Sequence, residues 1–152
     1  NFYPHPINGN VLPHIDSFLE DGYTKEEHKM VNETRKILHL PGLPVTATTV
    51  RVPVPFGHGV SINAELERPF QMQEIRECLA AQEGLIIQDE PGENIYPMPL
   101  YAAGRDEVFV GRIRRDFSVE NGLNLWVVAD NVRKGAAVNA VQIALRVLGA
   151  GK

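Results

Sequence analysis

Two long alternating segments near the carboxyl end limit the fold more than any other feature of the sequence. Residues 107–116, EVFVGRIRRD, and residues 122–130, GLNLWVVAD, are rich in β-branched and aromatic residues, which favour strands. The five residues between them end in Asn121, and the Asn121-Gly122 dipeptide is typical of tight hairpin turns. The pattern therefore predicts a long antiparallel β-hairpin.

Three further segments have the composition of strands. Residues 45–54, VTATTVRVPV, and residues 60–67, VSINAELE, both alternate, and residues 85–88, LIIQ, form a short apolar run. In the first segment, the alternation places Val50, Val52 and Val54 on one face and turns Arg51 to the other. We expect residues 45–54 and 60–67 to be strands that can pair with each other.

Helices are predicted at three places. In residues 24–39, Thr24 and Glu27 have the spacing of a capping box, and apolar residues follow at helical spacing. Residues 68–84 and 133–149 have helical apolar spacing and each ends in glycine. The order of elements predicts one α+β domain over residues 1–152, a mixed, largely antiparallel sheet with helices packed on one face.

Composition excludes several classes of partner. The chain has 152 residues, 43% hydrophobic, and a formal net charge of −4, so it lacks the basic surface that nucleic acids or anionic membranes require. Its apolar runs are shorter than a membrane span, and its single cysteine cannot form an internal disulfide. These features favour a cytoplasmic, reduced setting with neither nucleic acid nor membrane as a partner.

The amino end is rich in turn-forming residues. Residues 1–16, NFYPHPINGNVLPHID, contain three prolines and a glycine, start without methionine and lack the layout of a signal peptide. Irregular segments of this kind commonly lie against another part of a protein. We therefore expect a fragment whose upstream portion is absent.

The stretch RVPVPFGHG, residues 51–59, supplies two candidate functional side chains. Arg51 lies on the predicted strand, and His58 lies between two glycines in the turn that follows. An arginine held on a strand can bind a carboxylate with its guanidinium, and a histidine on an open turn can exchange protons near neutral pH. The alternative is a surface salt bridge and an ordinary loop histidine, and spacing alone favours that alternative.

Glu26 and Lys29 form a second candidate pair. They are three residues apart on the first predicted helix, so they share one edge of it. A solvated ion pair of little stabilising effect is the default interpretation. As parts of a site, the carboxylate would suit an ammonium group and the lysine a phosphate.

Other polar residues give weaker signals. In DNVRKGAA, residues 130–137, Asp130 or Asn131 is expected to cap a helix, and the Asn131 amide can also bond a ligand carboxamide. Cys78 is expected to be a buried or half-buried spacer without a catalytic role. The five histidines lack the spacing of metal ligands, so no metal site is predicted.

Four longer motifs in the same order give a more specific indication. They are GYTKEEHKMVNETRKIL, TTVRVPVPFGH, VFVGRIRRD and LWVVADNVRKGAAVNAVQIA. Together they resemble the carboxy-terminal part of the aspartate-semialdehyde dehydrogenase family over nearly the whole chain. The resemblance implies an α+β catalytic and dimerisation domain similar to that of glyceraldehyde-3-phosphate dehydrogenase, in a homodimer or homotetramer. It also implies NADP-dependent reduction of aspartyl phosphate through a cysteine thioester, on the route to lysine, threonine, methionine and diaminopimelate.

The resemblance also implies a role for each candidate residue. Glu26 would hold the substrate's amino group, Lys29 the phosphate and Arg51 the carboxylate. His58 would be the acid/base residue, and Asn131 would contact the cofactor. These are the residues that spacing and chemistry had already singled out.

Part of the implied enzyme has no counterpart in this sequence. The nucleophilic cysteine and the NADP-binding Rossmann domain of the family are not represented, so we expect residues 1–152 alone to be inactive. Two alternatives stay open at this point. One is the related N-acetyl-γ-glutamyl-phosphate reductase, whose substrate lacks a free ammonium for Glu26, and the other is a dimerisation module without catalysis.

Overall fold

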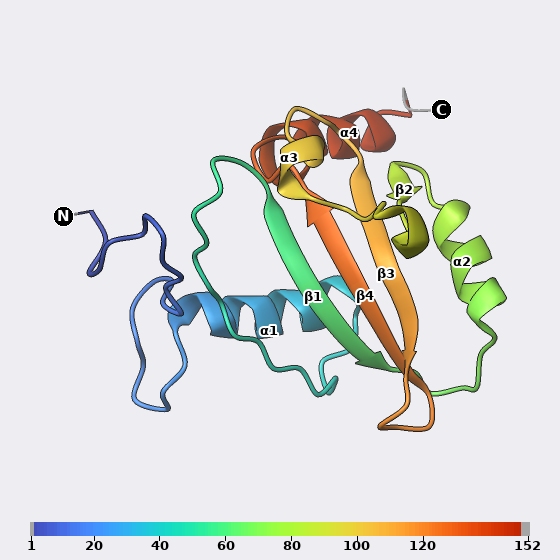
Figure 1. The fold of residues 1–152 in the computed structure, drawn as a ribbon, viewed down its shortest axis with the longest axis horizontal. Coiled ribbons are helices and arrows are strands. Elements are labelled where there is room, and N and C mark those ends of the chain that lie inside the picture. The colour runs from blue at the N-terminus through green and yellow to red at the C-terminus, as the bar shows by residue number, and fades with distance from the viewer. Residues whose placement is uncertain (1, 150–152) are drawn as a thin grey trace. The chain divides into compact units, whose positions relative to one another are not determined.

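The structure is a computed structural model that describes residues 2–149. These residues fall into two compact units, one ending at Val54 and the other beginning at Pro55. The helices and strands are drawn in Figure 1. None of the helices within residues 2–149 has both the length and the apolar character that crossing a membrane requires.

The first unit is built around one helix, α1 (Lys25–Ile37). Its N-cap is Thr24, whose hydroxyl accepts the Glu27 N–H, while the Glu27 carboxylate accepts the Thr24 N–H. This is the predicted capping box, which satisfies backbone donors that the first helical turn leaves free. The prediction of a helix beginning at Thr24 is confirmed.

Residues 45–54 of the same unit do not form the predicted strand. Only Arg51 pairs, in an isolated antiparallel bridge with Leu12. The side chains also do not form a buried apolar face, since Thr49 is buried whereas Val50, Val52 and Val54 are exposed. The prediction was wrong because alternation does not reveal which partner satisfies a backbone: here the Thr49 N–H donates to the Glu27 side chain instead of to a neighbouring strand.

The second unit contains a four-stranded sheet. Its strands are β1 (His58–Glu65), β2 (Leu85–Ile87), β3 (Val108–Asp116) and β4 (Gly122–Ala129), arranged in the order β1-β4-β3-β2 (Figure 1). β4 pairs antiparallel with both β1 and β3, and β2 pairs parallel with β3. The predicted hairpin and the predicted α+β class with a mixed, largely antiparallel sheet are confirmed. The predicted pairing of residues 45–54 with 60–67 is wrong, since β4 is the partner of β1.

A β-bulge interrupts β3. Gly111 pairs with Trp126 and Arg114 with Asn124, so two residues of β3, Arg112 and Ile113, oppose a single residue of β4. Arg112 adopts a φ of 52°, a left-handed conformation that is unusual for a residue with a side chain. The extra residue shifts the alternation of β3 by one position after Gly111.

The two faces of the sheet carry separate apolar clusters. The larger cluster has Phe70, Val110, Ile113 and Leu123 at its centre, and α2 (Met72–Ala80) adds Met72, Ile75 and Leu79. On the opposite face, Ala102 of α3 (Pro99–Ala102) packs with Phe109 and Val128. α2 lies within residues 68–84, where a helix was predicted. The segment between β2 and β3, which carries α3, also contains the short helix η1 (Pro91–Glu93).

The last predicted helix has two parts. A π-helical turn, η2 (Arg133–Ala137), leads into α4 (Val138–Val147). The side chains of Val141, Ile143 and Val147 are more than half exposed. These three side chains therefore belong to neither apolar cluster of the sheet.

Candidate active site

Glu26 and Lys29 lie side by side on α1, as their spacing predicted. The Lys29 Nζ is 3.6 Å from Glu26 Oε1, and both side chains are partly open to solvent. The neighbouring capping box fixes the first turn of the helix that carries them. An exposed pair of this kind contributes little to stability, so its charges remain available to a ligand.

Arg51 is held in the first unit through its backbone and an aromatic ring. Its N–H and C=O are bonded to Leu12, and its guanidinium lies 5.0 Å from the centre of the Tyr3 ring. Within residues 2–149, the Arg51 guanidinium forms no ion pair with a carboxylate. It is therefore a half-buried cation whose charge is free to bind an anion, although the strand predicted to hold it is absent.

Glu27 is a structural residue that the sequence revealed only in part. The capping box was predicted, but the second contact of the carboxylate, to the Thr49 N–H at 2.9 Å, was not. The pKa of Glu27 is held below its ordinary value, chiefly by the Thr24 N–H and then by the Thr49 N–H. Glu27 thus ties α1 to residues 45–54, the segment that carries Arg51.

His58 and Asn131 belong to the second unit and are positioned by the pairing of β1 with β4. His58 was predicted in a turn but is the first residue of β1, opposite Ala129 at the end of β4. Asn131 lies two residues beyond Ala129, and its Oδ1 accepts the Gly57 N–H at 3.2 Å. This hydrogen bond joins residues 74 positions apart and fixes the backbone immediately before His58.

Gly57 is required by its conformation and its surroundings. Its φ is 87°, and a Cβ at this position would lie 3.3 Å from the Pro99 Cβ and 3.4 Å from the Ala129 carbonyl oxygen. A side chain would therefore be strained and crowded. The glycine lets residue 57 reach the Asn131 amide and leaves the His58 side chain exposed at the strand end.

Asp130 holds the turn that presents Asn131. Its buried carboxylate accepts the N–H groups of Gly104, Val132 and Arg133. The Gly104 N–H is the main cause of the lowered pKa of Asp130. Of the two residues predicted to cap this turn, Asp130 is the cap, which leaves the Asn131 amide free for other partners.

Cys78 is a further side chain of the second unit that could react. Cys78 was predicted to be buried or half-buried, but it is exposed because it lies beside, and not within, the stripe of Met72, Ile75 and Leu79 that packs on the sheet. Within residues 2–149, His, Cys, Asp and Glu side chains do not gather in groups of three or more that could hold a metal ion.

The chain matches one family of enzymes by sequence. The family model described as "Semialdehyde dehydrogenase, dimerisation domain" matches residues 1–134. Aspartate-semialdehyde dehydrogenase of Aquifex aeolicus is 60% identical over 142 residues, and that of Bacillus subtilis is 50% identical over 141 residues. These alignments cover 93% and 92% of this chain but only 42% and 41% of the two relatives.

Solved structures show the same relationship. Aspartate semialdehyde dehydrogenase II of Vibrio cholerae, complexed with ASA, superposes with a TM-score of 0.92 at 44% identity, over 98% of this chain and 44% of that one. The Candida albicans enzyme with NADP superposes with a TM-score of 0.71 at 26% identity, over 95% of this chain and 45% of that one. The chain therefore belongs to the semialdehyde dehydrogenase dimerisation-domain family.

Proposed function

We propose that this chain is the substrate-binding and dimerisation part of an NADP-dependent aspartate-semialdehyde dehydrogenase. The whole enzyme would convert aspartyl phosphate to aspartate semialdehyde through a cysteine thioester, with the cysteine supplied by a part of the enzyme outside these residues. The names of the relatives support this reaction. The observation that supports the proposal is the hydrogen bond from the Gly57 N–H to the Asn131 Oδ1, which joins the residue before the candidate acid/base His58 to the candidate cofactor contact Asn131.

In this proposal, three charged side chains of the first unit bind the substrate. The Arg51 guanidinium binds the substrate carboxylate with two parallel hydrogen bonds, and the Glu26 carboxylate binds the ammonium group. Lys29 binds the phosphate. Since Glu26 and Lys29 are only 3.6 Å apart, they can contact neighbouring ammonium and phosphate groups once their own ion pair opens.

Asn131 and His58 have complementary tasks. The Asn131 Oδ1 is occupied by Gly57, while its Nδ2 has no acceptor among residues 2–149, so this donor fits the carboxamide oxygen of a nicotinamide. NADP, when bound, supplies the hydride chemistry. His58 moves the protons: it removes one from the cysteine thiol as the sulfur attacks, and it returns one to the cysteine sulfur when the aldehyde is released.

The proposal includes a homodimer in a cytoplasmic setting. The family description refers to dimerisation. Sedimentation analysis of the chain tests this part separately from the chemistry. We expect a dimer, and a monomer at all protein concentrations would contradict the dimerisation role.

The catalytic proposal is tested by replacing His58 in the full-length enzyme. We expect His58→Asn to lower kcat by at least about a hundredfold with little change in KM, because proton transfer contributes to the transition state and not to substrate binding. Glu26→Gln should instead raise KM for aspartate semialdehyde. Unchanged kcat in His58→Asn would contradict the acid/base role.

A further inference from the structure

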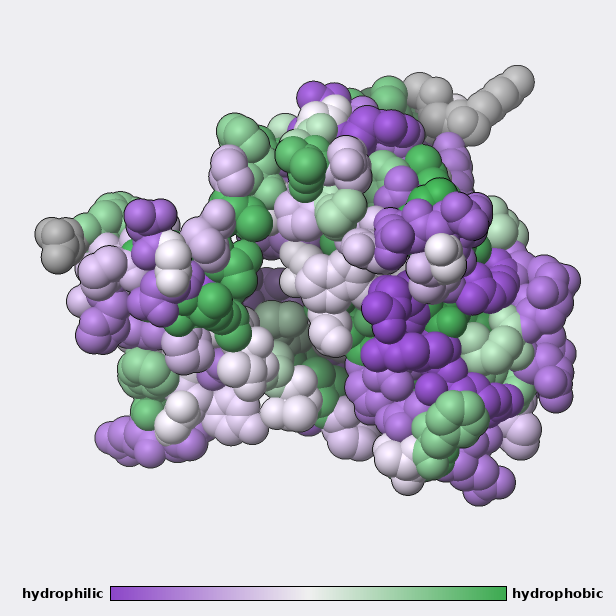
Figure 2. All heavy atoms as spheres, viewed as in Figure 1, coloured by the Kyte–Doolittle hydropathy of each residue, from purple (hydrophilic) through white to green (hydrophobic). Residues whose placement is uncertain are grey.

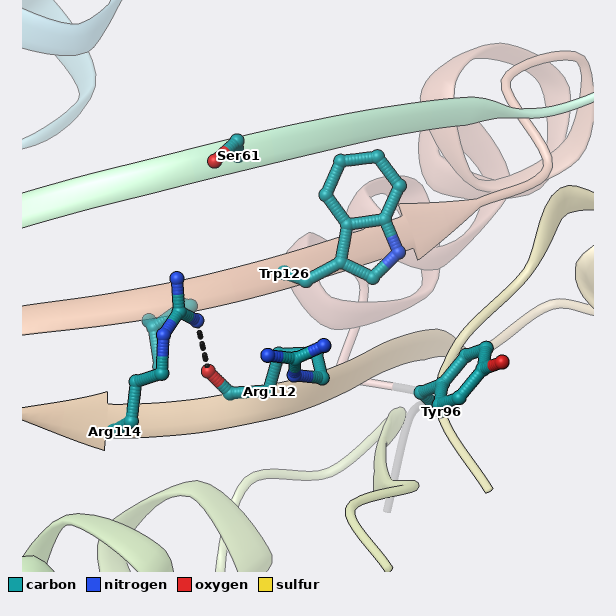
Figure 3. Close-up of a pocket in the computed structure, with 6 residues that line it drawn as sticks. Ser61, Tyr96, Arg112, Arg114 and Trp126 are labelled. Carbon is teal, nitrogen blue, oxygen red and sulfur yellow. Dashed lines mark hydrogen bonds between the residues drawn. The ribbon is translucent and has the colours of Figure 1, made fainter. Parts of the chain in front are cut away.

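One pocket of the second unit contains none of the five candidate site residues. It has a volume of about 280 Å³ and is lined by Ser61, Tyr96, Arg112, Arg114, Leu125 and Trp126. Figure 3 shows these side chains on three neighbouring strands and on the segment after β2. The volume lies near the lower limit of small-molecule sites, so the pocket suits a small ion and not a nucleotide.

The β-bulge is what brings both arginines into this pocket. Val110 and Ile113 both point into the larger apolar cluster. In a regular strand every second residue lies on the same face, so Arg112 and Arg114 would share the apolar face of Val110. The extra residue reverses the alternation. Arg112 and Arg114 therefore both lie on the opposite face, where Figure 2 shows hydrophilic side chains gathered over β3.

A buried carboxylate maintains the bulge. Asp89, whose side chain is only 2% exposed, accepts the Arg112 N–H at 2.6 Å, the Ile113 N–H at 3.3 Å and one N–H of the Arg76 guanidinium at 2.6 Å. These contacts hold Arg112 in its left-handed conformation. Strained residues that the surrounding structure fixes in this way are frequent at ligand sites.

The two guanidinium groups have unused capacity for an anion. Within residues 2–149, neither Arg112 nor Arg114 forms an ion pair with a carboxylate. Arg114 donates to the Arg112 carbonyl oxygen at 2.7 Å, which restrains its head group (Figure 3). Asp116, which acts on Arg114 electrostatically, is already bonded to Asn63 and Ser118.

The other walls of the pocket are compatible with an anion. The Trp126 Nε1–H donates to the Pro97 carbonyl oxygen at 2.8 Å, so the indole is fixed and presents an apolar surface. Ser61 adds a hydroxyl donor. We propose that this pocket binds a small oxyanion, a phosphate or a carboxylate, between the guanidinium groups of Arg112 and Arg114.

Trp126 provides the readout, because it is the only tryptophan of the chain. Inorganic phosphate, and succinate in a parallel series, would be titrated into the chain in a buffer without other oxyanions. We expect a saturable change in tryptophan fluorescence. Arg112→Gly should weaken phosphate binding by about tenfold or more, and it should fold well because glycine suits the φ of residue 112.

Arg146→Gln is the matched control. It removes one positive charge from an exposed arginine of α4 and should leave phosphate affinity unchanged. The proposal is overturned if the fluorescence change does not saturate or if Arg112→Gly leaves the phosphate affinity unaltered. It is also overturned if both variants lose phosphate affinity equally. If phosphate binds saturably only when the protein is diluted to a monomer, an acidic side chain of a second copy fills the pocket in the dimer, and that result would also overturn the proposal.

Discussion

Residues 45–54 and strand β1 have similar β-branched, alternating sequences but obtain their backbone partners differently. β1 is paired with β4 at every position from His58 to Glu65. The backbone of residues 45–54 has one bridge, to Leu12, one bond to the Glu27 side chain and one local bond, from the Val54 N–H to the Val52 carbonyl oxygen. The difference shows that strand-like composition produces a strand only where another segment offers a continuous row of donors and acceptors.

The largest predicted effect tests the packing on which β1 depends. Val128 of β4 lies opposite Gly59 and is fully buried, whereas Val52 is 49% exposed. We expect Val128→Ala to lower the free energy of unfolding by about 2–3 kcal/mol and Val52→Ala to change it by less than about 0.5 kcal/mol. Urea unfolding measures both variants, and similar losses would remove the proposed difference between the two segments.

A smaller effect is expected from adding a methyl group to β1. A Cβ at Gly59 would lie 2.6 Å from the Trp126 ring, whereas a Cβ at Gly42 would meet nothing within 4 Å. Gly59→Ala should therefore displace the indole, change tryptophan fluorescence and cost about 1–2 kcal/mol. Gly42→Ala is the control in the first unit, and it should leave both the fluorescence and the stability nearly unchanged.

The smallest predicted effect is local and concerns the contact that replaces a strand partner. Glu27→Gln removes the negative charge that accepts the Thr49 N–H. We expect hydrogen exchange of the Thr49 amide to become about tenfold faster, with little change in the amides of β1. Glu33→Gln, an exposed change on the same helix, should have no such effect.

The same contact should respond to acid in a defined direction. The pKa of Glu27 is lowered in the folded chain from its ordinary value of 4.5. Its stabilising effect is therefore complete above about that pH and is lost as the pH falls through the lowered pKa. Protection of the Thr49 amide should decrease over this acidic range in the parent chain, and a decrease of equal size in Glu27→Gln would contradict the assignment.

The parts of the fold that follow from local chemistry could be predicted from the sequence. The capping box located α1, and the Asn121-Gly122 turn located the hairpin of β3 and β4. The partner of β1 could not be predicted, because alternation does not specify register or neighbour. Cys78 was misplaced for a similar reason, since adjacency to an apolar stripe does not show how far the packed face extends around a helix.

In the candidate site too, only contacts that depend on local spacing could be predicted from the sequence. The contact between Glu26 and Lys29 follows from helical spacing, and it was predicted. The contact between Gly57 and Asn131 depends on the register of β1 with β4, and the contact between Glu27 and Thr49 depends on a fold-back within the first unit. The assigned roles of Glu26, Lys29, Arg51, His58 and Asn131 stay predictions, and the Glu26→Gln and His58→Asn variants test two of them.

The bulge in β3 also bears on which insertions and deletions the family fold can accept. Removing residue 112 would leave Val110, Gly111, Ile113 and Arg114 in regular alternation, each on the face that it now occupies. Removing any residue before it, from Val108 to Val110, would instead move an apolar side chain out of the core. Within β3, position 112 is therefore the place where a deletion would keep the neighbouring side chains on their present faces, with the loss of one surface charge and of the N–H that the buried Asp89 carboxylate accepts.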